Sequence, residues 1–159
     1  MRTCLAIVAL LALTGPAAAS EVEQFLKTCA LQQDRAECEN DARQFTKWYM
    51  AALKKDHISQ RNVADTFSHG RSAAVARDPV QGCAWWLVVN ISGSPKVDSR
   101  DWVSLETECS RLSLDELTNA KARAVAITKT IAAGGEQTSP TVKGKRPAKP
   151  LDGEAGSLF

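Results

Sequence analysis

The chain has few of the residues from which enzyme active sites and metal centres are built. It contains only two histidines, His57 and His69, and it has no G-x-S-x-G, no H-E-x-x-H and no S-x-x-K followed by K-T-G. The common signatures of serine and zinc hydrolases are therefore missing. A position at a helix end explains both histidines, because a cation suits the negative end of the helix dipole. We assign no catalytic, cofactor-binding or metal-binding residue and expect no cofactor.

The net charge is also small, and the chain beyond residue 19 lacks long apolar runs and strand-like alternation. The formal net charge is only +2 at pH 7, whereas a dedicated nucleic-acid binder carries a strong basic patch. Beyond residue 19, no segment approaches the length of a membrane-spanning helix. No segment alternates apolar and polar residues as a half-buried strand does, so we predict an all-α fold.

The first 19 residues have the three parts of a secretory signal peptide. Arg2 supplies the positive start, residues 4–13 form an apolar run, and residues 15–19 are the small residues typical of a cleavage site. The apolar run is too short to span a bilayer as a mature helix. We predict that residues 1–19 are a signal peptide and that the mature protein is periplasmic or secreted.

Four cysteines follow this leader: Cys29, Cys38, Cys83 and Cys109. An even number in a short exported chain indicates disulfides. Zinc is the alternative, but the chain has no C-x2-C pair. Of the three possible connectivities, 29–38 with 83–109 fits best, because the two members of each pair lie at similar distances from the turn of an expected helical hairpin.

Helix-start signals divide the chain into six expected helices. Asp34, Asp78, Asp98 and Ser113 each precede a run with helical apolar spacing, and Ser59 is expected to cap a further helix. The first four helices cover roughly 21–32, 35–55, 59–70 and 79–92; the fifth carries 102–112 and the sixth carries 117–131. The fourth is apolar almost all round, which is typical of a central buried helix. These helices form a predicted domain over residues 20–133.

Residues 134–159 differ from the rest of the chain. Two glycines are expected to end the last helix, and the segment beyond is rich in Gly, Pro, Ser and Lys. It carries too few apolar groups to offset the entropy of ordering, so we predict a disordered tail. Its basic cluster is a candidate for weak, salt-sensitive contact with the cell wall, with a solvated linker as the alternative. The cluster consists of Lys143, Lys145, Arg146 and Lys149.

Two segments repeat at an offset of 37 residues. Asp41 precedes Trp48 by seven positions, and Asp78 precedes Trp85 by the same number. A period of this length indicates stacked helical hairpins, in which the aromatic residue of one hairpin wedges against the next. Trp48 and Trp85 are therefore expected in the core.

The second copy, residues 63–93, resembles a Sel1-like repeat, a relative of the tetratricopeptide repeat. The resemblance extends loosely over 41–133, and it departs from the family pattern at Gly82, where the family has alanine. It implies antiparallel helical hairpins stacked as a short solenoid, and disulfide-stapled exported members are in keeping with it. The positions that correspond to the repeat core are Trp48, Phe67, Gly70, Asp78, Trp85 and Gly93.

The expected function is protein–protein interaction. A rigid stack of hairpins would hold a periplasmic or envelope partner, as a regulator, an inhibitor or an immunity-type binder. The candidate contact residues are Arg71 and Arg77, which flank the long loop, and the aromatic residues Trp86 and Trp102. The alternatives are a small cell-wall-acting hydrolase that uses His69 or a carboxylate, and a purely structural envelope component.

Overall fold

The computed structural model describes residues 21–136, so the predicted signal peptide and residues 137–159 of the predicted tail lie outside the described residues. The described part is all-helical, as predicted, and it contains no strand beyond one isolated bridge. Its elements are η1 (Cys29–Leu31), α2 (Arg35–Leu53), α3 (His57–His69), α4 (Pro79–Ile91), α5 (Ser99–Cys109) and α6 (Leu114–Glu136). No helix within this range is both long enough and apolar enough to cross a bilayer.

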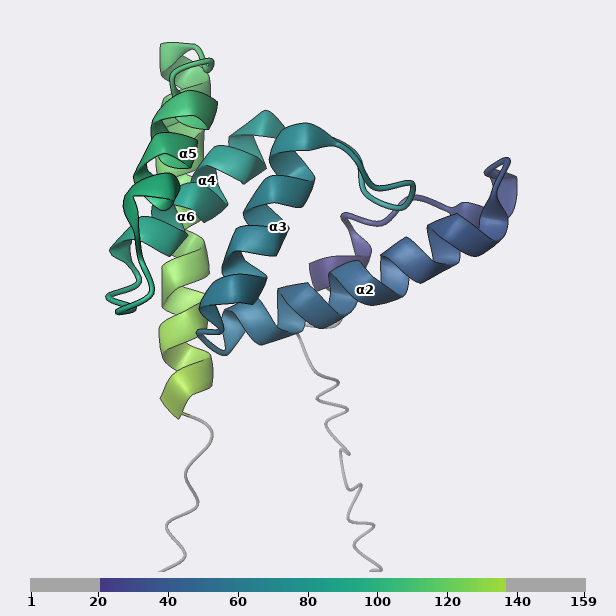
Figure 1. Cartoon of the computed structure of the whole chain (residues 1–159), viewed down its shortest axis with the longest axis horizontal. Helices are drawn as coiled ribbons and strands as arrows, with labels where there is room; N and C mark the ends of the chain where they lie inside the picture. The colour runs from purple at the N-terminus through teal and green to yellow at the C-terminus, as the bar shows by residue number, and fades with distance from the viewer. Residues whose placement is uncertain (1–20, 137–159) are drawn as a thin grey trace, which may run out of the picture.

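Helix α4 occupies the centre of the fold and packs against α3, α5 and α6 (Figure 1). Its position agrees with the all-round apolar sequence from which a central buried helix was predicted. Helix α3 approaches α4 closely at Gly82, where a Cβ atom would lie 2.4 Å from Ser68 Oγ and 2.9 Å from Ser68 N. Glycine is required at this crossing because any side chain would push the two helices apart.

An aromatic cluster forms the core between α2, α3 and α4. The Phe45 and Phe67 rings meet edge to face at 5.4 Å, and the Tyr49 and Trp85 rings do so at 5.5 Å. Phe25, from the segment before η1, adds a ring 5.1 Å from Phe67. Edge-to-face pairs contribute about 0.5–1.5 kcal/mol each beyond the area they bury, so this cluster fixes the mutual placement of three helices.

Aspartates cap the four helices α2 to α5, namely Asp34, Asp56, Asp78 and Asp98. Each side chain accepts a backbone N–H from the first turn of its helix, which satisfies a donor that has no partner within the helix. The expected cap at Ser59 is wrong, because α3 begins earlier and Ser59 N donates to Asp56 Oδ1 at 2.8 Å.

The expected position of His57 at the end of a helix is also wrong. Helix α2 ends at Leu53, and Lys55 then adopts a left-handed φ of 68°, which reverses the chain. His57 is consequently the first residue of α3, where the helix dipole does not favour a cation. Its side chain is buried.

The expected first helix over 21–32 is interrupted. Residues 21–23 are helical, but a turn follows, Leu26 forms an antiparallel bridge with Val75, and Lys27 N donates to Ala74 O at 2.7 Å. The backbone groups of this segment are hydrogen-bonded to the loop after α3, so they are not free to form the bonds of a helix. Tertiary pairing overrides the local helical period at this place.

Both predicted disulfides are present. Cys29–Cys38 joins η1 to α2 with a Cα–Cα distance of 5.5 Å, and Cys83–Cys109 joins α4 to α5 with a Cα–Cα distance of 5.1 Å. The first therefore ties a 3₁₀ turn to a helix, whereas the second joins two helices across a hairpin. At the other end of the fold, α6 continues through Gly134 to Glu136, past its expected end at the two glycines.

Candidate functional site

Helix α5 is short but is fixed at both ends. The Cys83–Cys109 disulfide ties its last residue to α4. At its start, Asp98 accepts from Arg100 N, and Asp101 accepts from Asp98 N at 2.9 Å, which forms a reciprocal capping box. A helix of this length is marginal alone, so these attachments hold its position.

A buried ion pair attaches α5 to α3. Asp101, only 2% exposed, accepts two hydrogen bonds from Arg61, from Nε to Oδ1 at 2.5 Å and from Nη2 to Oδ2 at 2.6 Å. Burial alone raises the pKa of Asp101, but the Arg61 guanidinium and the Asp98 amide outweigh it and hold that pKa below its usual range. A bidentate pair of this kind fixes direction as well as distance.

Two further polar side chains surround this ion pair. His57 is buried, and its Nε2 lies 3.5 Å from Asp101 Oδ2 without forming a hydrogen bond. Asn90 Nδ2 donates to Trp86 O at 2.9 Å and to Asp101 O at 3.1 Å, which adds a link from α4. The network of Arg61, Asp101, His57 and Asn90 lies between three helices, with Arg61 partly exposed, so we interpret it as a support for α5.

The outer face of α5 exposes large apolar side chains. Trp102 is 55% exposed and Val103 is 62% exposed. Glu106 and Ser110 lie on the same side of the helix at helical spacing and are also exposed. Below we call Trp102, Val103, Glu106 and Ser110 the α5 outer face. Among the predicted contact residues, Trp102 is an exposed aromatic residue, and Arg71 and Arg77 are also exposed.

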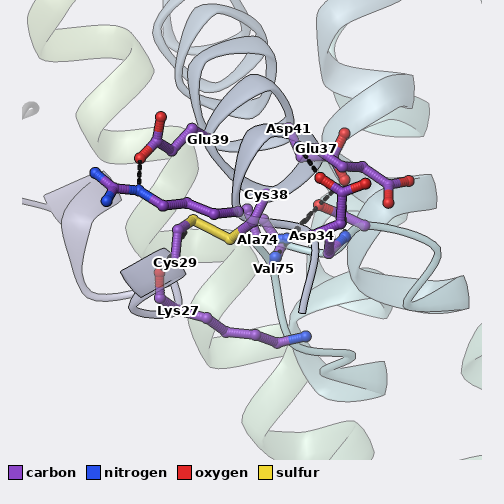
Figure 2. The surroundings of a disulfide bond; sticks show 12 residues. Lys27, Cys29, Asp34, Glu37, Cys38, Glu39, Asp41, Ala74 and Val75 are labelled. Atoms are coloured by element: carbon purple, nitrogen blue, oxygen red, sulfur yellow. Dashed lines mark hydrogen bonds and ion pairs between the residues drawn. A yellow bond between two sulfur atoms is a disulfide. The ribbon is translucent and has the colours of Figure 1, made fainter. Parts of the chain in front are cut away.

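The loop between α3 and α4 is held against α2 and the N-terminal segment. Asp41 Oδ2 accepts from Ser72 Oγ at 3.0 Å and from Ala73 N at 2.7 Å. Figure 2 shows Asp41 on one side of this loop, with Ala74 and Val75 beside the Cys29–Cys38 disulfide. The loop is thus pinned along its length.

The two predicted arginine contacts differ in their roles. Arg77 Nε donates to Ser68 O at 2.8 Å, and Arg77 Cβ would lie 2.7 Å from a Cβ at Gly70, whose φ is 63°. Arg77 therefore closes the C-terminal turn of α3, which makes it part of the structure of this corner. Arg71 is exposed at the edge of a pocket.

This pocket lies between α2 and α3 and has a volume of about 220 Å³. Trp48, half-buried, lines it beside the buried ring of Phe45. Below we call it the Trp48 pocket. The polar side chains around it come from both helices and the loop: Asp41, Gln44, Asn62, Asp65, Thr66, Arg71 and Ser72.

One predicted contact residue, Trp86, and two predicted repeat-core residues, Phe67 and Trp85, are buried. Trp86 is only 6% exposed, so its side chain does not form part of a binding surface in this structure. Phe67 and Trp85 are fully enclosed in the core. Gly93 has a left-handed φ of 69° after α4, and Asp78 caps the start of α4. The sequence pattern predicted Trp85 in the core and Trp86 as a contact, but both are buried because α4 is covered on nearly all sides.

The alternative enzymatic residue, His69, ends α3 as predicted. Its Nδ1 lies 3.0 Å from Asp65 Oδ1, and its Nε2 lies 3.8 Å from Oε1 of the buried Glu108. Arg111 Nη1 lies 3.2 Å from the same Glu108 oxygen. Within residues 21–136, no three His, Cys, Asp or Glu side chains are grouped to hold a metal ion. We interpret His69 as one member of a partly exposed polar cluster.

Sequence reasoning missed the Arg61–Asp101 pair. Asp101 follows the Asp98 cap by three positions, which is the spacing of a capping box, so its local role was open to prediction. The partner Arg61 lies 40 residues earlier, and no local pattern signals it.

Comparison with known proteins gives no relative from which a function follows. The chain matches no protein-family model, no curated protein and no solved structure. What is proposed for its function comes from its own residues and contacts.

Proposed function

We propose that this chain is an exported helical protein that binds another protein of the periplasm or cell envelope through the α5 outer face. The observation that carries the proposal is an exposed tryptophan beside an exposed valine on a helix that is fixed at both ends. The expected partner offers an apolar pocket that receives the indole of Trp102. The proposed roles are those of a regulator, an inhibitor or an immunity-type binder.

The energetics of interfaces favour such an arrangement. Tryptophan is enriched among the few residues that dominate binding energy, and truncation of such a residue costs about 2 kcal/mol or more. Ordering a mobile segment on binding would subtract from that gain. The Cys83–Cys109 disulfide and the Arg61–Asp101 pair already fix α5. The backbone around Trp102 is therefore ordered before binding, and little of the binding free energy is lost in ordering it.

Two features support export. Residues 1–19 have the composition of a signal peptide. The two disulfides fit an oxidising compartment, since thiols of cytosolic proteins are usually kept reduced. On this basis we propose the periplasm or the exterior as the place where the protein works.

We also propose that α3 and α4 form a Sel1-like hairpin within a short solenoid. The support comes from the residues that match the repeat pattern. Phe67 and Trp85 are fully buried between helices, Gly70 is the left-handed C-cap of α3, and Asp78 is the N-cap of α4. Glycine at 82 takes the place of the usual alanine, at the point where Ser68 comes closest.

Site-specific crosslinking tests the binding proposal. A photoreactive amino acid is placed at Val103 and, as a matched control, at Val125 on α6, which is 55% exposed. In cells, we expect a discrete protein adduct from position 103 and none of the same mass from position 125. The partner is then identified and purified, and its affinity is measured for the wild-type protein and for Trp102→Ala. We expect the variant to bind about 30-fold more weakly or worse, with an unchanged melting temperature.

Some outcomes would contradict the proposal. Equal adducts at both positions would mean that the crosslinker reports collisions, and a Trp102→Ala affinity equal to that of the wild type would remove the indole from the interface. Turnover of peptidoglycan by the purified protein, abolished by His69→Ala, would instead favour the hydrolase.

A further inference from the structure

We infer that the Trp48 pocket is a second contact site, which receives a lysine or arginine side chain of a protein ligand. This inference rests on the proposed function, because the cation is taken to belong to a protein. The pocket is formed by α2, α3 and the start of the loop after α3, whereas the binding face proposed above is on α5. It would therefore add an anchor that differs in chemistry from Trp102.

The shape of the pocket suits one long side chain. Its two walls are helices, with Trp48 and Gln44 on α2 and Asn62 and Asp65 on α3. Trp48, which is half-buried, contributes the apolar surface, beside the almost completely buried Phe45. The volume of about 220 Å³ is below the range of drug-sized ligand sites and is suited to a single side chain.

The charge of the lining favours a cation. Asp41 and Asp65 are acidic and Arg71 is basic, so the formal charge of these three residues is −2 + 1 = −1. The contacts of Asp41 with Ser72 and Ala73 use one carboxylate oxygen, and the contact of Asp65 with His69 likewise uses one. Within residues 21–136, each carboxylate therefore keeps a second oxygen that can accept from an ammonium or guanidinium group.

The indole of Trp48 supplies the second element of the site. The ring pairs of the core join Phe25, Phe45, Tyr49, Phe67 and Trp85. Trp48 takes part in none of these pairs, and no lysine or arginine of the described range stacks on its ring. Tryptophan is the aromatic side chain that attracts cations most strongly.

Other guests fit less well. An anion would meet two carboxylates against one guanidinium. A purely apolar side chain would desolvate Asp41 and Asp65 without giving either a partner, which is costly. A lysine or arginine side chain places its methylene groups along Trp48 and its charge near the carboxylates.

Peptide titration monitored by NMR tests this inference directly. The probe is a blocked Gly-Lys-Gly tripeptide, and its matched control has norleucine in place of lysine, with the same stem and no charge. The signal is the Trp48 indole N–H, assigned with Trp48→Phe. We expect a saturable shift with the lysine peptide and a response about 2- to 30-fold weaker with the norleucine peptide.

Variants then test the carboxylate. Asp65→Asn should weaken binding of the lysine peptide by about 2- to 5-fold, as expected for loss of a partly exposed charge pair. The control, Asp115→Asn, changes an exposed carboxylate on α6 and should leave the affinity unchanged. This pair separates a specific contact from a general effect of net charge.

Three results would overturn the inference: no shift of Trp48 up to the solubility limit of the lysine peptide, equal binding of the norleucine peptide, or equal weakening by Asp65→Asn and Asp115→Asn. None of them bears on crosslinking from position 103, which reports the α5 outer face alone. Conversely, loss of the position-103 adduct with a normal Trp48 titration would contradict the proposed function only.

Discussion

Replacing Arg61 by methionine removes the guanidinium that pairs with the buried carboxylate of Asp101. Methionine keeps much of the length and apolar volume of the side chain, so the change mainly removes charge and hydrogen-bond donors. Asp101 would keep only the Asp98 amide among its strong donors. Since the carboxylate is 2% exposed, water cannot take over the two lost bonds without opening the packing between α3 and α5.

The expected loss is large. Breaking a buried ion pair by removing one partner costs about 3–5 kcal/mol, out of a typical total stability of about 5–15 kcal/mol. For a domain of this size, that loss lowers the melting temperature by about 10–20 °C. Adding Asp101→Asn to Arg61→Met should recover part of the stability, because it removes the unpaired charge and keeps an acceptor for Asp98 N.

Urea and thermal unfolding, followed by circular dichroism, measure this effect. The matched control is Arg100→Met, because Arg100 also pairs with a carboxylate of the capping box, through Nη2 to Asp98 Oδ2 at 2.9 Å. The Arg100 side chain is exposed, so its removal should cost less than about 1 kcal/mol. If the two variants unfold within about 1 kcal/mol of each other, the Arg61–Asp101 pair does not hold α5 as argued.

The pH dependence gives an independent check of the same pair. The folded-state pKa of Asp101 is lowered, so its contribution to stability is present above the unfolded pKa of about 3.9 and is lost as the pH falls through the lower folded value. In Arg61→Met the unpaired, buried carboxylate is expected to have a raised pKa. The difference between wild type and variant should therefore shrink as the pH is lowered from neutrality toward about 4. If the stability difference between wild type and Arg61→Met is the same at neutral pH and near pH 4, the unpaired charge of Asp101 is not the cause of the loss.

Three further predictions concern the scaffold. Gly82→Ala should lower the free energy of unfolding by about 1–3 kcal/mol because its Cβ would meet Ser68, whereas Gly134→Ala, which meets nothing within 4 Å, should be neutral or stabilising; equal effects would contradict the close crossing. Tyr49 is the one tyrosine of the chain, and burial, followed by its contact with Glu21, raises its pKa, so native-state absorbance at 295 nm should stay flat beyond pH 10, where a free tyrosine ionises; an ordinary titration would contradict its burial. Removing the α4–α5 disulfide, whose cysteines are 26 positions apart, should cost about 3.5 kcal/mol, and removing the η1–α2 disulfide, whose cysteines are nine positions apart, about 2.6 kcal/mol in urea unfolding; the reverse order would refute the loop-length argument.

The features that sequence predicts well depend on a few neighbouring residues. Aspartate caps, proline at the first position of α4 and the apolar period all act within one or two turns of a helix, and most of the expected helices agree with the structure. The disulfide pairing was also predicted correctly, because it was inferred from how far each cysteine lies along the chain from the nearest expected turn.

The failures occur where distant segments meet. Residues 24–28 carry a helical period, but their backbone pairs with the loop after α3, through the bridge to Val75 and the hydrogen bond to Ala74 O. Arg61 and Asp101 are 40 positions apart, and their pairing depends on how α3 and α5 cross α4. Trp86 and Trp102 have similar local sequence signals, yet one is enclosed by α4 packing and the other faces outward.

Non-reducing peptide mass mapping of the protein isolated from the cell envelope tests most directly whether a disulfide-fixed scaffold is exported to present Trp102. We predict a mature chain that lacks residues 1–19 and carries the 29–38 and 83–109 linkages. A chain recovered from the cytosol with residues 1–19 attached and all four thiols reduced would contradict it.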